Sequence, residues 1–253
     1  GDKTALVVAP LVAAAGIPVC KMSGRGLGHT GGTIDKLESI PGFRTELALP
    51  ELFAQVKTVG IGLVGQTGNL VPADKQLYAL RDVTGTVASI PLIATSIMSK
   101  KLAGGADGFV LDVKVGNGAF LKTKEEAEKL GELMVAIGKN AGRKTVAVLS
   151  AMDQPLGQAI GNALEVKEAI ATLRGEGPPD LEELSLVLGA QMLVLAGQET
   201  DAVQAQVKLK ALINGGEGLR VFRRWVEAQG GDARVVDDPD LLPTAPVVVK
   251  VKS

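Results

Sequence analysis

The sequence of 253 residues contains one cysteine, Cys20, and one histidine, His29. A single cysteine excludes an internal disulfide framework and a cysteine metal cluster, and a single histidine excludes a histidine-rich metal site. Aromatic residues make up 3% of the chain. That is too few for the stacking platform of a protein that binds single-stranded nucleic acid.

An excess of charge of one sign is also missing. The 27 Lys and Arg residues balance 28 Asp and Glu residues, for a formal net charge of -1. The chain therefore lacks the broad basic footprint of a DNA- or RNA-binding protein. No apolar run approaches the roughly 20 residues that span a bilayer, and the residues from Gly1 to Thr4 do not resemble a signal peptide. We expect no nucleic-acid or membrane partner and a cytoplasmic location.

What the sequence does contain is a composition typical of a folded globular protein, with 46% hydrophobic and 22% charged residues. The apolar pattern predicts strands at 17–20, 60–65, 108–114, 145–149 and 247–251. It predicts helices at 4–15, 33–39, 50–59, 73–83, 86–102, 124–140, 162–173, 181–195, 202–213 and 219–228. Strands separated by helices pair in parallel, so we predict an α/β fold with a mainly parallel sheet flanked by helices.

The predicted elements also suggest two lobes. Residues 73–103 hold two consecutive helices without a strand between them. This segment is therefore interpreted as a small helical insertion that belongs to a separate α lobe. Residues 1–72 and 104–253 are expected to form the α/β lobe.

Glycine is present in excess, with 32 residues, and its clustering indicates special backbone geometry. Eleven residues from Ser23 to Thr33 form a glycine-rich loop between a predicted strand and a helix, a geometry that lets backbone N–H groups converge on an anion. The loop brings Lys21, Ser23, Arg25 and Thr33 to that place, although a structural turn remains an alternative.

Two nucleotide-binding motifs match the same loop only in part. Residues 26–31 match G-x-G-x-x-G, but that dinucleotide motif needs a following strand that ends in an acidic residue about 20 positions later. Residues 43–50 make a poor buried strand. A phosphate-binding P-loop also fails, because Gly32 stands where that motif has lysine.

A second group combines Arg81, Ser96 and Lys100. Ser96 and Lys100 are four residues apart on one predicted helix and so share a face, while Arg81 lies near the end of the preceding helix. The largely apolar stretch 89–98 suggests that Lys100 borders a desolvated pocket. Spacing alone, however, favours two solvated surface cations.

Three further features have both a functional and a structural interpretation. The glycine turn at 116–118 follows a predicted strand, which makes Lys114 and Phe120 candidate walls of a ligand crevice, or parts of a plain turn. The carboxylates of Glu165 and Glu168 form a solvated helix face, or one of them holds a cation. His29 is interpreted as a loop histidine that satisfies backbone groups rather than as a general base.

Longer segments carry a family resemblance. They are Lys21-Met-Ser-Gly-Arg-Gly-Leu-Gly-His-Thr-Gly-Gly-Thr33 with Asp35-Lys-Leu-Glu-Ser-Ile-Pro-Gly-Phe43, Ala73-Asp-Lys75 with Tyr78-Ala-Leu-Arg-Asp-Val-Thr84, and Asp112-Val-Lys-Val-Gly-Asn-Gly-Ala-Phe120. In this order they resemble the thymidine phosphorylase and pyrimidine-nucleoside phosphorylase family, closest to its bacterial pyrimidine-nucleoside type, over essentially the whole chain.

The resemblance implies reversible phosphorolysis of a pyrimidine nucleoside such as uridine, thymidine or deoxyuridine. Inorganic phosphate attacks C1′ of the ribose or deoxyribose, and the free base leaves. The residues that match the family's phosphate contacts are Lys21, Ser23 and Thr33. Those that match its pyrimidine contacts are Arg81, Ser96 and Lys100, with Phe120 near the base pocket. Arg81 and Lys100 are the implied catalytic groups, because they would stabilise the departing pyrimidine anion.

The resemblance also implies a homodimer without an organic cofactor. A potassium-type cation is implied at Gly1, Lys3, Leu156, Ala159 and Glu168. Family members carry a leading Lys-His-Ser-Thr-Gly-Gly-x-Gly-Asp motif, and this chain begins at its last two residues, Gly1 and Asp2. We therefore expect an internal section of the enzyme that lacks both ends.

Two alternatives belong to other classes. One is a relative of the anthranilate-type phosphoribosyltransferases, which would need magnesium and a pyrophosphate-bearing substrate. The segment from Lys21 to Phe43 argues against it. The other is a non-catalytic section that binds phosphate or a nucleotide.

Overall fold

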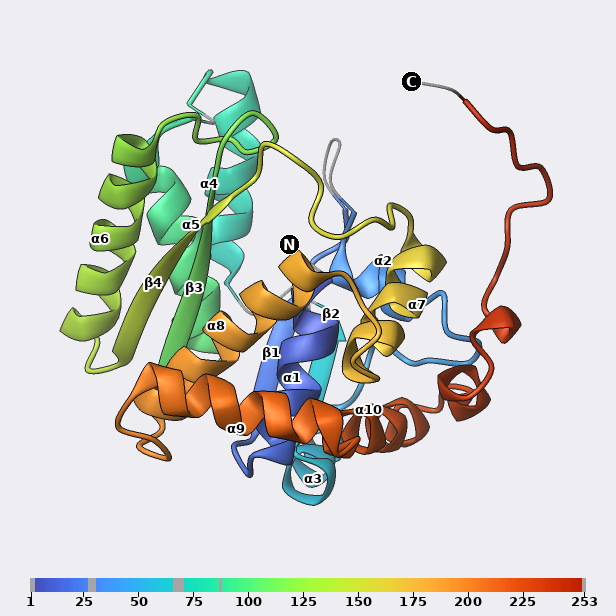
Figure 1. Cartoon of the computed structure of the whole chain (residues 1–253). Coiled ribbons are helices and arrows are strands. Elements are labelled where there is room, and N and C mark those ends of the chain that lie inside the picture. The colour runs from blue at the N-terminus through green and yellow to red at the C-terminus, as the bar shows by residue number, and fades with distance from the viewer. Residues whose placement is uncertain (1–2, 27–30, 66–70, 87, 252–253) are drawn as a thin grey trace.

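The structure is a computed structural model, and it describes residues 3–26, 31–65, 71–86 and 88–251. Helices and strands alternate along much of the chain (Figure 1). The strands are β1 (Val19–Ser23), β2 (Ile61–Gly65), β3 (Gly108–Val115) and β4 (Lys144–Ala151). The α-helices are α1 (Thr4–Ala14), α2 (Thr33–Leu37), α3 (Leu49–Val59), α4 (Pro72–Val83), α5 (Ile90–Ala103), α6 (Lys124–Asn140), α7 (Asn162–Leu173), α8 (Pro179–Leu195), α9 (Ala202–Asn214) and α10 (Glu217–Ala228).

The strands pair in parallel, β1 with β2 and β3 with β4. Within the described residues they form two separate two-stranded sheets. In the β1–β2 pair Lys21 lies opposite Leu63, and in the β3–β4 pair Asp112 lies opposite Val148. The predicted α/β class is confirmed.

Two predicted strands need correction. The first begins at Val19 rather than at residue 17 and continues to Ser23, so Lys21 and Ser23 belong to the strand itself. The strand predicted at 247–251 is wrong, because Val247, Val248 and Val249 are each at least 74% exposed and no described strand lies beside them. An apolar run becomes a strand only when a neighbour satisfies its backbone. Figure 1 shows this end of the chain leading away from the body.

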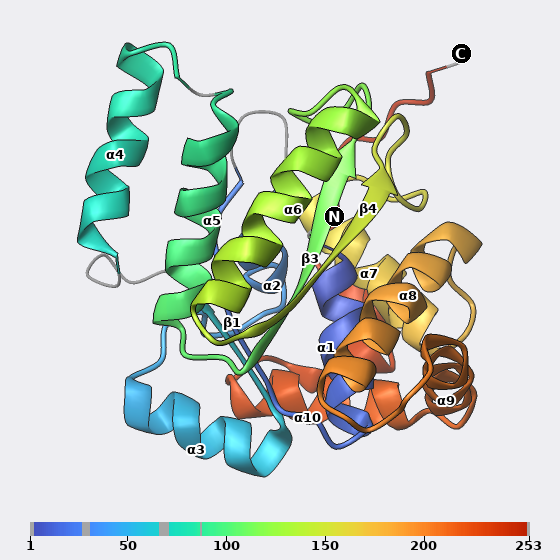
Figure 2. The ribbon, with the colours of Figure 1, turned by 90° about the vertical axis from the view of Figure 1, so that its left-hand side faces the viewer.

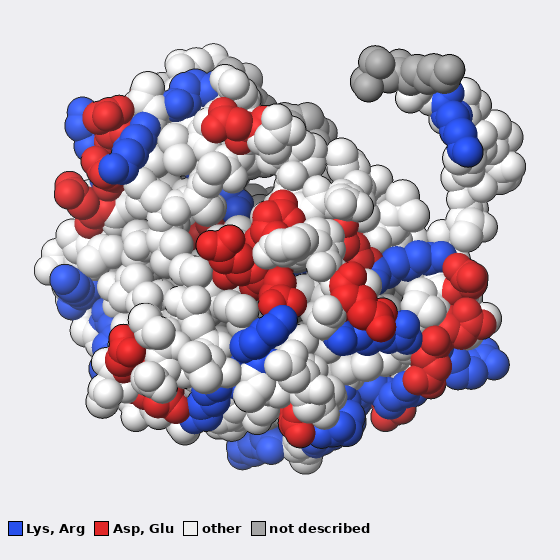
Figure 3. All heavy atoms as spheres, viewed as in Figure 1, with Lys and Arg blue, Asp and Glu red and all other residues white. Residues whose placement is uncertain are grey.

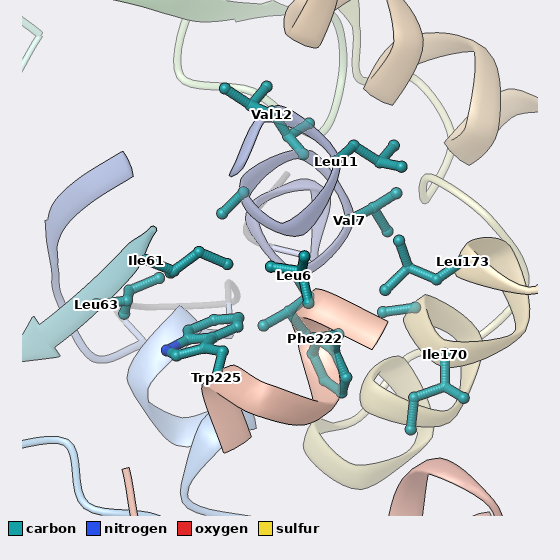
Figure 4. Close-up of a cluster of buried hydrophobic side chains, with 14 of the residues drawn as sticks. Leu6, Val7, Leu11, Val12, Ile61, Leu63, Ile170, Leu173, Phe222 and Trp225 are labelled. Atoms are coloured by element: carbon teal, nitrogen blue, oxygen red, sulfur yellow. The ribbon is translucent and has the colours of Figure 1, made fainter. Parts of the chain in front are cut away.

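A first hydrophobic core surrounds α1, whose residues Leu6, Val7 and Leu11 are fully buried (Figure 4). The ring of Trp225 on α10 makes edge-to-face contacts with Phe222 and Phe43, at centroid distances of 5.7 and 5.9 Å. Side chains from β2, α7, α8 and α9 complete this core. A helix that is apolar on all sides, as α1 is, is typical of the centre of a protein.

A second core is formed by α5, β3, α6 and β4. Ala94 and Met98 of α5 are fully buried in it, beside apolar residues of β3 and α6. Helix α6 begins at a capping box, in which the Thr123 side chain accepts from the N–H of Glu126 and the Glu126 side chain accepts from the N–H of Thr123. Figure 2 shows α6 covering β3 and β4, with α4 and α5 beside it.

The two cores are joined by α8 and by the segment 152–161. Helix α8 packs on α1 and α9 and also contacts β3 and β4. The segment 152–161 leads from β4 in the second core to α7 in the first (Figure 1). The assignment of residues 73–103 to a separate lobe stays a prediction.

The surface carries both signs of charge. On the face shown in Figure 3, Lys and Arg side chains are scattered among Asp and Glu rather than gathered into one basic patch. Among the described helices, none is both long and apolar enough to span a bilayer.

Candidate active site

The carboxyl-terminal half of β1 positions the first candidate residues. Lys21 and Ser23 alternate with Met22 along the strand, so they point to the same side. Ser23 is 8% exposed, and its Oγ makes no hydrogen bond with the described residues. Thr33, the first residue of α2, is also buried. A buried hydroxyl of this kind is unusual, because such groups normally have a partner.

The glycine loop folds back on the start of α2. A methyl group added at Gly32 would lie 2.3 Å from the backbone carbon of Arg25 and from the nitrogen of Gly26, so only glycine fits there. The N–H of Gly26 donates to Asp35 at 2.6 Å. The loop is thus fixed by backbone contact, while residues 27–30, including His29, lie outside the described residues.

The Arg25 guanidinium pairs with two carboxylates of this protein and is therefore not placed to bind an anion. Its guanidinium pairs with Asp35 at 3.0 Å and with both oxygens of Glu38 at 2.6 and 2.8 Å. The hydrogen bond from Arg25 lowers the pKa of Glu38. Although partial burial raises the pKa of Asp35, the bonds from Gly26 and Arg25 outweigh it and the net shift is downward. Arg25 therefore belongs to the frame of the loop.

The dinucleotide interpretation finds no support in the fold. Residues 43–48 form no strand, so the acidic strand end required by that motif is missing there. This agrees with the expectation that the loop is not a nicotinamide site.

The second group of candidates lies on α4 and α5. The Lys100 ammonium donates to the backbone oxygen of Ser96 at 3.0 Å and to its Oγ at 2.9 Å, and it pairs with the Asp74 carboxylate on α4. Ser96 is 7% exposed. The predicted shared face of Ser96 and Lys100 is confirmed by these bonds, and sequence spacing gave no signal for Asp74.

Arg81 lies in the last turn of α4 and is 8% exposed. The interpretation of Arg81 as a solvated surface cation is therefore wrong. Helices α4 and α5 contact each other. The Arg81 guanidinium is thus buried on the helix that packs against the helix carrying Ser96 and Lys100.

Lys101 is a residue that sequence reasoning missed. Burial and the nearby positive charge of Lys21 lower its pKa to about 8. A methyl group added at Gly104, just after α5, would lie 3.2 Å from Met22 Cε. The end of α5 therefore lies against β1. No pattern in the sequence indicates that the environment of Lys101 differs from that of Lys100.

The residues at the end of β3 and just after it are less closely tied to these groups. Lys114 pairs with Asp112 at 2.8 Å and donates to Ser150 at 2.9 Å. Phe120 is 70% exposed. Its place near a base pocket stays a prediction.

The residues implied for a cation do come together. The Lys3 ammonium donates to the backbone oxygens of Leu156 and Ala159 at 2.6 and 2.7 Å, and to Glu168 at 2.6 Å. Gly1 lies outside the described residues.

The solvated-face interpretation is wrong for Glu168, which is buried, and for Glu165, which pairs with the buried Lys36 at 3.3 Å. Among the described residues no cluster of three His, Cys, Asp or Glu side chains forms a metal site.

Comparison with known proteins places the chain in a family. The model of the glycosyl transferase family, a/b domain, matches residues 1–219, and the chain belongs to this family. Over 253 residues the chain is 61% identical to pyrimidine-nucleoside phosphorylase of Staphylococcus haemolyticus, and over 251 residues 61% identical to that of Bacillus subtilis. The alignments cover 100% and 99% of this chain. The chain spans 58% of the length of each relative. The resemblance that the sequence motifs indicated is thereby confirmed.

A solved structure supports the fold. Anthranilate phosphoribosyltransferase from Thermus thermophilus superimposes with a TM-score of 0.68 over 89% of this chain and 73% of its own. Its sequence is 17% identical. The likeness therefore concerns the fold alone.

Proposed function

We propose that the protein catalyses the reversible phosphorolysis of pyrimidine nucleosides, with uridine, thymidine and deoxyuridine as candidate substrates. The names of its relatives and the family match support a pyrimidine-nucleoside phosphorylase. The observation that carries the proposal is a pair of polar groups on neighbouring elements: the buried Ser23 hydroxyl on β1, and the hydrogen-bonded Ser96–Lys100 pair on α5, whose end lies against β1. One group suits an anion and the other suits a pyrimidine.

In the proposed reaction Lys21, Ser23 and Thr33 hold phosphate. A phosphate oxygen forms a bond to C1′ of the sugar while the bond from C1′ to the base nitrogen breaks, and its electron pair leaves with the base. Positive charge develops on the sugar and negative charge on the pyrimidine. Lys100 and Arg81 stabilise the pyrimidine anion, and fixed charges are most effective where water is excluded. No covalent nucleophile is needed, because positioning and electrostatics suffice.

The assembly and location are proposed on the same basis. We propose that the protein acts as a homodimer in the cytoplasm, as the family resemblance implies. Sedimentation of the full-length protein tests the first part. A monomer at working concentrations would contradict it.

The function is tested by measuring base release from uridine, thymidine and deoxyuridine with and without phosphate. Release that requires phosphate is the expected result, and release without phosphate would indicate a hydrolase. Consumption of anthranilate with phosphoribosyl pyrophosphate and magnesium would instead support the transferase alternative. Binding of phosphate without turnover would point to a non-catalytic section.

A further inference from the structure

The ammonium of Lys3 lies in a closed cage of oxygen atoms, formed by the backbone oxygens of Leu156 and Ala159 and the carboxylate of Glu168. We call these three groups and Lys3 the Lys3 cage. A lysine ammonium carries three donor hydrogens, and three acceptors lie within 2.7 Å of Lys3 Nζ. The side chains of Lys3 and Glu168 are 6% and 7% exposed. The donor capacity of the ammonium is therefore filled inside the protein.

Both oxygens of the Glu168 carboxylate also accept hydrogen bonds inside the protein. Its Oε2 accepts from Lys3, and its Oε1 accepts from the N–H groups of Gln158 and Ala159 at 2.7 and 2.8 Å. Gly157 has a left-handed φ of +68°, and a methyl group added there would lie 2.5 Å from Glu168 Oε2. The loop from Leu156 to Ala159 thus wraps closely around the carboxylate, with carbonyls turned to the cation and N–H groups to the anion.

The potassium-type ion implied by the family resemblance does not fit this arrangement. Backbone oxygens and a carboxylate are the ligands that such an ion would need, and in this chain they already bind an ammonium. The buried pair is neutral, with one positive and one negative charge. A second cation would leave an uncompensated charge in a site closed to water, which is strongly unfavourable.

We propose that the Lys3 ammonium takes the place of a monovalent metal ion in this protein, which makes the site independent of potassium. The cage ties the start of α1, in the first core, to the segment 152–161 that arrives from β4 in the second. A covalently attached cation keeps this connection at any salt composition. The proposal concerns folding stability and stands apart from the proposed reaction.

The first test compares thermal unfolding of the full-length protein in potassium, sodium and choline chloride at equal ionic strength. The expected result is the same Tm in all three salts. A saturable rise of Tm that is specific for potassium would overturn the proposal, since a bound ion stabilises the state that binds it. This measurement decides the question even if no variant folds.

The second test restores the need for an ion. Lys3→Thr removes the ammonium and leaves the oxygens and the buried carboxylate. We expect a lower Tm in choline and a saturable recovery with potassium of roughly 2–4 °C or more. Crystals soaked in thallium(I), which replaces potassium and scatters anomalously, are expected to show an ion in the cage of the variant and none in the native protein. Thallium in the native cage would contradict the proposal.

Two controls separate this effect from general salt effects. In Lys3→Thr/Glu168→Gln the carboxylate is lost as well, and the potassium response is expected to disappear. Lys208→Thr breaks a more exposed ion pair with Glu199 and is expected to show no difference between potassium and choline. A potassium response in Lys208→Thr equal to that in Lys3→Thr would overturn the assignment to the cage.

Discussion

At the scale of single residues, Lys100 has the geometry of a preorganised cation. Its ammonium is fixed by Ser96 and by Asp74 before any ligand binds. These three acceptors match its three donor hydrogens, so Lys100 acts on negative charge that develops in the transition state through its positive charge, held at a fixed position.

We expect Lys100→Met to lower kcat for uridine phosphorolysis by about 10²–10³-fold, the usual loss when one electrostatic contact to a developing anion is removed. Lys124→Met, which alters an exposed lysine on α6, serves as the matched control and should leave kcat unchanged. Steady-state kinetics with saturating phosphate measure both, and a Tm for each variant excludes unfolding. Equal kcat values in the native protein and Lys100→Met would remove Lys100 from the site.

Lys101 provides a second prediction, because burial and the charge of Lys21 lower its pKa to about 8 from an ordinary 10.5. Between these values the unfolded chain binds more protons than the folded one, so this lysine makes the free energy of unfolding rise with pH across that interval. Below pH 8 the cost of the partly buried charge is fully present. Lys101→Met lacks this dependence, and we expect it to be more stable than the native protein at neutral pH.

Urea unfolding at about pH 7, 8.5 and 10 measures the effect as the difference between native protein and Lys101→Met, which should shrink as pH rises. The exposed Lys124→Met is again the comparison, with a difference independent of pH over this range. Parallel stability curves for native protein and Lys101→Met would show that Lys101 is not desolvated.

At the scale of elements, the glycine loop depends on one close backbone contact. Gly32 lies where a methyl group would meet the backbone of Arg25 and Gly26 at 2.3 Å. Gly24 lies in the same loop, but a methyl group there would have no described atom within 4 Å. The two glycines therefore form a matched pair.

We expect Gly32→Ala to lower the free energy of unfolding by about 1–3 kcal/mol, the usual cost of inserting a methyl group into a filled space. Because the loop would move away from α2, the KM for phosphate should rise as well. Gly24→Ala should change neither quantity. Urea unfolding and phosphate titrations of the two variants check this, and equal behaviour would show that the contact at Gly32 is not needed.

The elements that the sequence predicted best are those with a complete local signal. Helix α6, with its capping box and amphipathic pattern, lies at Lys124–Asn140 as predicted. The run 247–251 has the composition of a strand but no partner strand among the described residues. A strand depends on a neighbour that is distant in sequence, and local patterns do not contain that information.

In the candidate site, too, a contact between residues close in sequence could be predicted, and contacts between distant residues could not. The spacing of Ser96 and Lys100 predicted a shared helix face, and they are hydrogen-bonded. The partner Asp74 is 26 residues away from Lys100, and the Lys3–Glu168 pair is separated by 165 residues. Such pairs arise from tertiary packing, so neither periodicity nor motif spacing could predict them.

At the scale of the whole molecule, Gln229 joins segments from distant parts of the first core. It is fully buried at the end of α10. Its Oε1 accepts from Trp225 at 2.5 Å and from Gln55 at 3.1 Å, while its Nε2 donates to the backbone oxygens of Arg44 at 2.6 Å and Leu63 at 3.0 Å. One amide thus connects α10 with α3, β2 and the segment before α3.

We expect Gln229→Leu to lower the free energy of unfolding by about 3 kcal/mol or more, because several buried groups lose their partner and each costs about 1–3 kcal/mol. The lone tryptophan of the chain, Trp225, reports this core by fluorescence, while far-UV circular dichroism reports the helices of both cores. Since α8 packs against both cores, the two signals should change together in urea. Gln204→Leu, at an exposed position of α9, should shift stability by less than about 0.5 kcal/mol. A fluorescence transition of Gln229→Leu at clearly lower urea than the dichroism transition would show that the two cores unfold separately.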